Sequence, residues 1–344
     1  MVSNTPSSEV LATYRTHADE LLRAALDTCG DLPIYGMLRY FMGYADSSLQ
    51  PISGSAGKRI RASLTLLAAD LCGGAASAND LAVAVELFHN FTLIHDDIED
   101  NDELRRGRPT VWKLWGLDHG INAGDAQAFL TTQYLLAAAS DPHGAQAAAG
   151  LTGHFREVIE GQYLDFELAR LPLNDSRVTV IAYLDMVRRK TSVLIGAALA
   201  AGGVAAGCTV AVRDALYTYG ESLGMAYQVA DDMASIWGDA AETGKRAYGD
   251  IVERKKTHPI LAARDHGAHD RLCELFRTSP SESEVLEIVS LLDTTGAREA
   301  TRALGDTYVA LAKQAAREVG EGAEILTTIV DTLVRFTPDT HHSD

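Results

Sequence analysis

The chain has little cysteine and little positive charge, and each shortage excludes a class of protein. Its 344 residues include only Cys29, Cys72, Cys208 and Cys273, none of them spaced as C-x-x-C. A zinc site, a dithiol motif and a disulfide framework are therefore not expected, and we expect four reduced, mostly buried thiols. Thirty Lys and Arg stand against 47 Asp and Glu, a formal net charge of −17. That balance argues against a nucleic-acid partner and against binding to an anionic membrane surface.

The sequence has few large apolar residues in any one run, and it predicts no leader segment. The N-terminus has no basic stretch followed by an apolar run, so the sequence predicts no secretion signal and a cytoplasmic protein. Residues 191–212 carry no charge, but half of them are Ala and Gly. Because so few of them are large and apolar, we expect a buried helix there and no membrane span.

Apolar residues recur with the period of a helix. Val285, Ile288, Val289 and Leu292 fall at i, i+3, i+4 and i+7. No long segment alternates in the manner of a strand, and Pro280 is typical of a helix start. Loops are expected near 45–57, 73–79, 101–109, 139–144, 171–177, 238–250 and 278–283. The sequence predicts one all-α domain over residues 1–344, with frayed ends at 1–8 and 337–344.

Two aspartate clusters each follow an apolar helical pattern. In the first, Asp96 and Asp100 are four residues apart, so on a helix their carboxylates share a face. Such a pair suits Mg²⁺, which takes hard oxygen ligands and completes its shell with water and phosphate. The second cluster holds Asp231, Asp232 and Asp239. Taken alone, each cluster could be a solvated acidic helix end, but a helical bundle can bring two of them to one cavity.

Two basic runs accompany the acidic clusters. GKRIR at 57–61 precedes an apolar helix, and RRGRPT at 105–110 follows the first aspartate cluster directly. Arg offers paired donors to phosphate oxygens and Lys acts as a point charge. In so acidic a chain, these runs predict an anion site, and the two facing carboxylate sets predict a metal clamp for a diphosphate.

These residues resemble the trans-isoprenyl diphosphate synthases, the polyprenyl synthetase family. Five pieces in order carry the resemblance: GKRIR at 57–61, ELFHNFTLIHDDIEDNDELRRGRPT at 86–110, GQYLD at 161–165, KTS at 190–192, and YQVADDMASIWGD with TGK at 227–245. The resemblance implies antiparallel helices around a deep central cavity and usually a homodimer. It also implies Mg²⁺-dependent condensation of isopentenyl diphosphate with an allylic prenyl diphosphate.

The resemblance also implies roles for individual residues. Asp96 and Asp100 would ligate two Mg²⁺ ions with help from Asp165, and Asp231 would ligate a third ion from the opposite wall. The remaining expected diphosphate and substrate contacts are Arg105, Lys190 and Lys245 for the allylic diphosphate, Lys58, Arg61, His89 and Arg106 for isopentenyl diphosphate, Thr191 and Gln228 for the carbocation, and Gln162 as a polar lining residue.

The second acidic motif departs from the family. Where DDxxD is usual, the fifth position is Ser235, and the acid is displaced to Asp239. Asp231, Ser235 and Asp239, at i, i+4 and i+8, resemble the second metal motif of class I terpene cyclases, which ionise one prenyl diphosphate. Asp232 is a further candidate metal ligand in this motif. If the helix ends near Gly238, however, Asp239 is only a loop acid. All the residues expected to bind isopentenyl diphosphate are present, which favours condensation over cyclisation. A third alternative is a non-catalytic regulatory subunit, and the intact metal-ligand motif argues against it.

Product length is expected to depend on the helix before the first cluster. Phe88 and Phe91 are three residues apart and can form the floor of a tunnel, while Thr92 leaves some room. In the family this pattern resembles a producer of geranylgeranyl (C20) diphosphate, with farnesyl (C15) diphosphate next.

Overall fold

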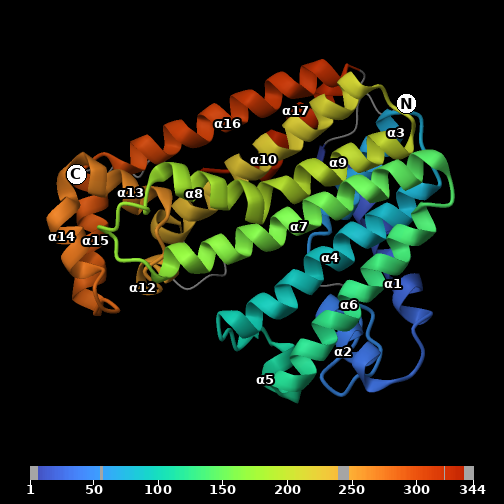
Figure 1. Cartoon of the computed structure of the whole chain (residues 1–344), viewed down its shortest axis with the longest axis horizontal. Coiled ribbons are helices and arrows are strands. Elements are labelled where there is room, and N and C mark those ends of the chain that lie inside the picture. Colours follow the sequence, from blue (N-terminus) through green and yellow to red (C-terminus); the bar gives the residue numbers. More distant parts are fainter. Residues whose placement is uncertain (1–6, 55–56, 239–247, 321, 337–344) are drawn as a thin grey trace. The chain divides into compact units, whose positions relative to one another are not determined.

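The computed structural model describes residues 7–54, 57–238, 248–320 and 322–336. It is almost entirely helical over these residues (Figure 1). The helices are α1 (Ser7–Asp27), α2 (Pro33–Met42), α3 (Ile60–Leu71), α4 (Ser77–Glu99), α5 (Val111–Trp115), α6 (Leu117–Ala138), α7 (Pro142–Arg170), α8 (Val180–Val187), α9 (Val193–Ala205), α10 (Val210–Trp237), α12 (Gly249–Val252), α13 (His258–Ala263), α14 (His269–Leu275), α15 (Glu282–Thr294), α16 (Ala297–Val319) and α17 (Ala323–Leu333). Two π-helical turns, η1 (Arg188–Ser192) and η2 (Arg264–Ala268), follow α8 and α13. The all-α prediction is confirmed.

The only strands in the described part of the chain form a hairpin within a predicted loop. β1 (Leu104–Arg105) pairs antiparallel with β2 (Arg108–Pro109), so Arg105 lies opposite Arg108. The two residues between them, Arg106 and Gly107, have φ of 54° and 73°. Such left-handed conformations are those of a tight two-residue hairpin turn, and glycine adopts them without strain. A two-residue strand is too short to show alternation in the sequence.

The chain divides into two compact units. The first comprises residues 1–155 and 197–217, and the second comprises 156–196 and 218–344. The prediction of a single domain is not tested by this division and stays a prediction. α7, α9 and α10 contribute residues to both units.

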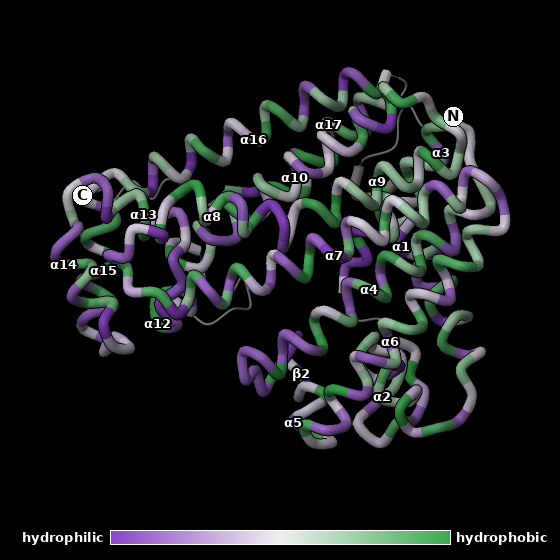
Figure 2. Tube along the Cα trace, viewed as in Figure 1, coloured by the Kyte–Doolittle hydropathy of each residue, from purple (hydrophilic) through white to green (hydrophobic). Residues whose placement is uncertain are grey.

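In the first unit, α4 packs along α6 and also against α3 and α1 (Figure 1). Its core contains Leu22, Leu38, Leu87 and Ile94, each at most 1% exposed. Removing such side chains from water is the main source of stability of the unit. The packing fixes α4, whose C-terminal end and following loop are hydrophilic (Figure 2). The same helix therefore combines a buried apolar body with an acidic end.

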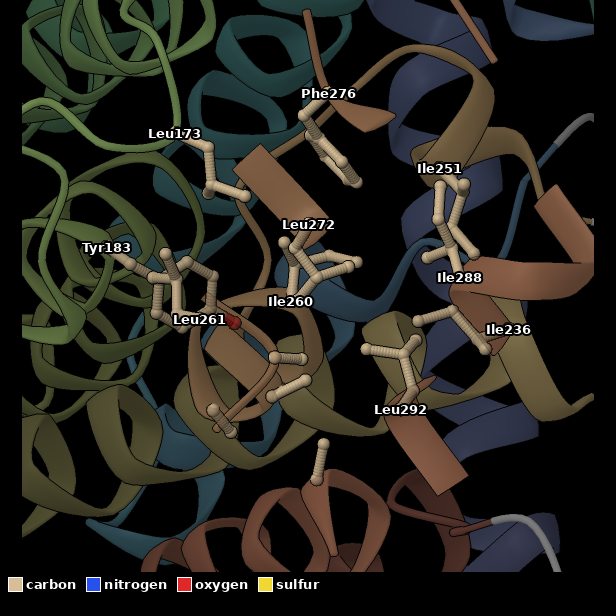
Figure 3. Close-up of a cluster of buried hydrophobic side chains, with 14 of the residues drawn as sticks. Leu173, Tyr183, Ile236, Ile251, Ile260, Leu261, Leu272, Phe276, Ile288 and Leu292 are labelled. Carbon is tan, nitrogen blue, oxygen red and sulfur yellow. The ribbon is translucent and has the colours of Figure 1, made fainter. Parts of the chain in front are cut away.

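In the second unit, residues from α8, α10, α12, α13, α14 and α15 share one apolar core. Figure 3 shows Tyr183, Ile260, Leu272 and Ile288 pointing into it, together with side chains from the other segments. The predicted helix start near Pro280 is confirmed, because α15 begins at Glu282 with a capping box in which Glu284 accepts a hydrogen bond from the N–H of Ser281.

Most of the uncharged stretch 191–212 forms the helix α9 (Val193–Ala205), which is buried as predicted, while residues 191–192 end η1 and residues 210–212 begin α10. Its small residues permit close packing, since a Cβ at Gly202 would lie 2.1 Å from the backbone oxygen of Thr65 on α3. Across the residues that the structure describes, we find no helix with the length and hydrophobicity needed to cross a bilayer.

Candidate active site

The acidic end of α4 carries the first aspartate cluster. Asp96 lies in the last turn and Asp100 is the C-cap, where its N–H donates to the Asp96 carbonyl at 2.9 Å. The hairpin returns Arg105 to this helix, where its Nη2 lies 3.4 Å from Asp96 Oδ2 and its Nε donates to Asp97. The structure therefore places Arg105 beside Asp96, at the helix end that also carries Asp100.

Asp97, which the sequence did not single out, is the buried member of this cluster. It is 1% exposed, and its Oδ2 has no hydrogen-bond partner. Burial raises the pKa of Asp97 to about 6, although Arg105 opposes the shift. One Asp97 oxygen is thus paired with Arg105 and the other has no partner, and hard carboxylate oxygens of this kind suit a divalent cation.

Several cations surround His89 on α4. Nη1 of Arg61 lies 3.1 Å from His89 Nε2. Burial and the positive charges of Arg61, Arg106, Arg105 and Arg59 lower the pKa of His89 well below its ordinary value. His89 is therefore neutral, and its Nε2 accepts a hydrogen bond from Arg61. We call Arg61, His89, Arg105 and Arg106 the cationic cluster; its concentrated positive charge suits an anion.

Of the other two cations in GKRIR, Lys58 is exposed and Arg59 is fully buried. Nε of Arg59 lies 2.8 Å from Asp19 Oδ1, and Nη2 donates to the Met42 carbonyl at 2.7 Å. A buried, paired guanidinium of this kind joins α1 and the end of α2 to the start of α3. Arg59 therefore positions the segment that carries Arg61.

The predicted floor residues form an aromatic stack on α4. The Phe88 and Phe91 rings are 5.6 Å apart and tilted by 56°. Phe88 stacks face to face on Phe155 of α7, with centroids 3.8 Å apart. The Thr92 hydroxyl donates to the His89 carbonyl at 2.8 Å. Phe155 was missed because only the fold brings α7 against this face of α4.

A hollow of about 170 Å³ in the second unit gathers six further candidates. They come from α7, η1 and α10, and they are Asp165, Lys190, Thr191, Gln228, Asp231 and Asp232. The sequence separates these residues by up to 67 positions (232 − 165), yet the fold lines one hollow with all of them. We call this hollow the aspartate pocket.

Hydrogen bonds order the polar groups of the aspartate pocket. Lys190 Nζ lies 2.5 Å from Asp165 Oδ2, and the Thr191 hydroxyl donates to Gln228 Oε1 at 3.1 Å. The Gln228 amide in turn donates to Asp232 Oδ1 at 2.9 Å. The Tyr183 hydroxyl donates to the other Asp232 oxygen at 2.5 Å. Burial, with Asp250 nearby, raises the pKa of Asp232 to about 7.

The π-helical turn η1 presents Lys190 and Thr191 to this pocket. π-helical turns are rare and frequently occur at functional sites. Two glycines allow the neighbouring helices to approach the turn: a Cβ at Gly161 of α7 would lie 2.3 Å from the Lys190 nitrogen, and one at Gly224 of α10 would lie 2.6 Å from the Ser192 Cα. The backbone of η1 therefore packs from two sides against helices that each have a glycine at the point of contact.

Comparison with known proteins decides the family. Residues 44–292 match the polyprenyl synthetase family model. The chain belongs to the polyprenyl synthetase family. Within that family, it is 37% identical over 270 residues to the (2E,6E)-farnesyl diphosphate synthase of Mycobacterium bovis, covering 76% of this chain and 74% of that protein. It is also 37% identical over 255 residues to the geranylgeranyl diphosphate synthase of Mycobacterium tuberculosis, covering 74% of this chain and 71% of that protein.

A solved structure agrees with this assignment. The polyprenyl synthetase of Streptomyces coelicolor A3(2) superposes with a TM-score of 0.87 at 35% identity, covering 95% of this chain and 99% of that one. The chain is therefore an enzyme of the trans-prenyltransferase class.

The unusual serine of this polyprenyl synthetase points inward. Ser235 is 8% exposed, and its hydroxyl donates to the Asp232 carbonyl of its own helix at 2.8 Å. α10 ends at Trp237, before the displaced acid. Asp239 and Lys245 lie outside the described residues. The metal roles of Ser235 and Asp239 stay predictions.

Two other expectations for this polyprenyl synthetase also stay predictions. Gln162 is half-buried on α7 and does not line the aspartate pocket. The two aspartate clusters belong to different units, so their meeting across a cavity is untested. Within the described ranges, no three His, Cys, Asp or Glu side chains are preassembled around a point where a metal could bind.

Sequence reasoning missed three charged residues of the aspartate pocket: Asp250, Lys255 and Lys256. Lys256 is buried, its Nζ donates to the Ala169 carbonyl at 2.6 Å, and burial lowers its pKa to about 8. Two adjacent lysines followed by Thr257 are a pattern in the sequence that could have indicated an anion-binding segment. They lie beyond the last motif of the resemblance, so that resemblance assigned them no role.

Proposed function

We propose that the protein condenses isopentenyl diphosphate with an allylic prenyl diphosphate in a Mg²⁺-dependent reaction. One observation carries this proposal: the chain has two separate arrangements suited to phosphate, the cationic cluster and the aspartate pocket with its lysines. A reaction that joins two diphosphate substrates needs two such arrangements, whereas ionisation of a single prenyl diphosphate needs one. Arg61, His89 and Arg106 of the cationic cluster would hold isopentenyl diphosphate together with Lys58, whereas Arg105 would contact the allylic diphosphate.

The carboxylates fit magnesium. Asp96 and Asp100 offer hard oxygen donors one helical turn apart, and Asp165, Asp231 and Asp250 line the aspartate pocket. Mg²⁺ is usually held by only one or two protein carboxylates, with water and substrate phosphate as its other ligands. The lack of a preassembled group of three ligands among the described residues is consistent with that habit. We propose three ions per site; when bound, they would neutralise the charge that develops on the departing diphosphate.

The side chains would bind and orient the allylic substrate. Lys190 and Lys255 provide positive charge beside the aspartates. The Thr191–Gln228–Asp232 hydrogen-bond chain fixes the Gln228 amide, so that its dipole and the Thr191 oxygen keep a constant orientation toward the pocket. Polar groups that are already oriented stabilise a developing cation without reorganising during the reaction.

The condensation balances without a dedicated protein base. The allylic C–O bond breaks and its electron pair leaves with the diphosphate. The double bond of isopentenyl diphosphate then forms the new C–C bond, and the proton that is lost goes to the released diphosphate. Apolar walls keep water from the cation.

We infer a C20 product, with C15 as the next possibility. The relatives include proteins named for both product lengths, so the inference depends on the residues expected to form the floor of the tunnel. The stack of Phe88 on Phe155 leaves no room for a chain to pass between the two rings. Phe91 is only half-buried beside them and is the residue that a growing chain would meet.

We propose that the protein forms a homodimer and that an apolar stripe on α6 is its interface. Ile121, Phe129 and Leu136 recur about every second turn, and they are 43%, 74% and 70% exposed. Large apolar side chains gathered on one exposed stripe are typical of a subunit interface. Sedimentation equilibrium should give the mass of a dimer, and Phe129→Glu should shift it toward a monomer. A wild-type monomer would contradict the proposal.

Product analysis tests the proposed reaction. The protein is incubated with Mg²⁺, isopentenyl diphosphate and a dimethylallyl, geranyl or farnesyl starter, and the products are identified by mass spectrometry. We expect a longer prenyl diphosphate, and none when either substrate is omitted. A hydrocarbon formed from the allylic diphosphate alone would instead identify a terpene cyclase.

A further inference from the structure

Two of the four cysteines lie together in the first unit. Cys72 is the C-cap of α3, and Cys208 follows the end of α9. Both are half-buried free thiols, and each is close enough to affect the pKa of the other. A Cβ built on Gly203 would lie 3.1 Å from the Cys208 sulfur and 3.6 Å from the Cys72 sulfur. Both sulfurs therefore converge above a glycine that leaves space for them.

The backbone holds both cysteines at helix ends. The Cys208 N–H donates to the Gly203 carbonyl at 3.0 Å, and Gly207 before it has a φ of +75°, which together form a Schellman cap. The Cys72 N–H donates to the Ala69 carbonyl at 3.0 Å, and the two glycines after it are both left-handed. The sulfurs thus lie on fixed helix ends, with glycines that allow the small adjustment a covalent bond requires.

We propose that Cys72 and Cys208 form a reversible disulfide when the protein meets a small-molecule disulfide such as oxidised glutathione. One thiolate attacks the small disulfide, forms a mixed disulfide and releases one small thiol. The second cysteine then attacks the mixed disulfide and releases the other small thiol. The two cysteine thiols are oxidised, the small disulfide is reduced to two thiols, and the protons pass to solvent and the released thiols.

The surroundings of the two thiols indicate which one reacts first. Burial raises the pKa of the Cys72 thiol to about 11. Burial also raises the pKa of Cys208, but Cys72 and the positive charge of Arg213 oppose that shift. Because the thiolate is the attacking form, Cys208 makes the first attack and Cys72 resolves the mixed disulfide.

The crosslink would join the ends of α3 and α9, two helices that already pack closely where Gly202 meets Thr65. A bond between residues 72 and 208 closes a long loop of chain and restricts the unfolded state. Oxidation is therefore expected to raise the melting temperature by several degrees.

The experiment exposes the purified full-length protein to mixtures of reduced and oxidised glutathione, blocks remaining thiols by alkylation and maps the peptides by mass spectrometry. We expect the loss of two hydrogen atoms and a peptide in which Cys72 is linked to Cys208, with Cys29 and Cys273 alkylated. The Cys72→Ser variant should accumulate a glutathione adduct on Cys208 and show no rise in melting temperature.

Cys29→Ser is the matched control, since it removes a half-buried cysteine and leaves the pair intact. It should form the crosslink as the unchanged protein does. A crosslink to any other cysteine, glutathione adducts that never resolve in the unchanged protein, or no reaction of either thiol would overturn the proposal.

Discussion

The close approach of α7 to the π-helical turn predicts that Gly161→Ala is damaging. A Cβ at this position would lie 2.3 Å from the nitrogen of Lys190 and 2.7 Å from its Cα. Ordinary contacts of a Cβ begin near 3.4 Å, so the turn and α7 would have to separate by about 1 Å (3.4 − 2.3). The atoms in the way are backbone, and they cannot move aside as a side-chain tip can.

Two effects of opposite sign set the magnitude. Overpacking of this kind costs roughly 1–3 kcal/mol of folding stability. Replacing glycine by alanine inside a helix recovers about 1 kcal/mol. We therefore expect the free energy of unfolding to fall by between about 0 and about 2 kcal/mol. A displacement of 1 Å at a substrate-positioning group can lower the rate by about 100-fold, so kcat should fall far more than stability does.

Gly150→Ala is the matched control in the same helix. A Cβ at Gly150 has no neighbouring atom within 4 Å, so this variant should be about 0.5–1 kcal/mol more stable and fully active. Urea unfolding and steady-state prenyl transfer are measured for both variants. If Gly161→Ala were as stable and active as Gly150→Ala, the close packing on η1 would have no functional consequence and the reasoning would be refuted.

Three further predictions concern the first aspartate cluster, the floor and the core. Asp96→Ala should lower kcat by at least about 10²–10³-fold, whereas Ser235→Ala, which loses only a bond to its own helix, should have a mild effect; near-normal turnover of Asp96→Ala with Mg²⁺ present would refute the metal assignment. Phe91→Ala should lengthen the product in a chromatographic assay, and unchanged lengths would argue against the floor. His258 is buried and donates from Nδ1 to Thr301, and burial lowers its pKa to about 4. The folded state therefore favours the neutral form of His258. The stabilisation of the folded state that follows is complete above the pKa of about 6.5 in the unfolded chain, and it is lost as the pH falls through 4. Unfolding measurements should show a loss of about 3 kcal/mol between pH 7 and pH 4 that is absent in His258→Gln; an equal loss in both would contradict this account.

The helical fold could be predicted because local patterns determine most of it. The stripe from Val285 to Leu292 and the cap before α15 are readable within a few residues. The hairpin at 104–109 and the π-helical turn η1 were not predicted. A two-residue strand has no period, and a π-helical turn differs from an α-helix only in its hydrogen bonding.

The candidate site could be predicted where residue chemistry carries the signal. Asp96 and Asp231 belong to acidic clusters whose residue types themselves indicate metal binding, whereas the role of Lys190 came only from the family resemblance. Phe155 and Gly161 were beyond reach because their importance comes from tertiary contacts. Phe155 meets Phe88 only after α7 packs on α4, and Gly161 matters only because η1 lies against it.

The cysteines show a different limit of sequence reasoning. The small number of cysteines in so long a chain predicted free thiols, and the four cysteines are free in the structure, but all four are half-buried and not mostly buried as expected. The pairing of Cys72 with Cys208 depends on two helix ends that the sequence separates widely and the fold brings together.

The central claim is that magnesium held by both aspartate clusters binds the allylic diphosphate. Isothermal titration calorimetry with an unreactive allylic diphosphate analogue measures this directly, because it requires no turnover. We predict that binding depends on Mg²⁺ and that Asp96→Ala and Asp231→Ala each weaken it at least about tenfold, or about 1.4 kcal/mol. Unchanged affinity in the presence of a chelator, or in either variant, would contradict the account.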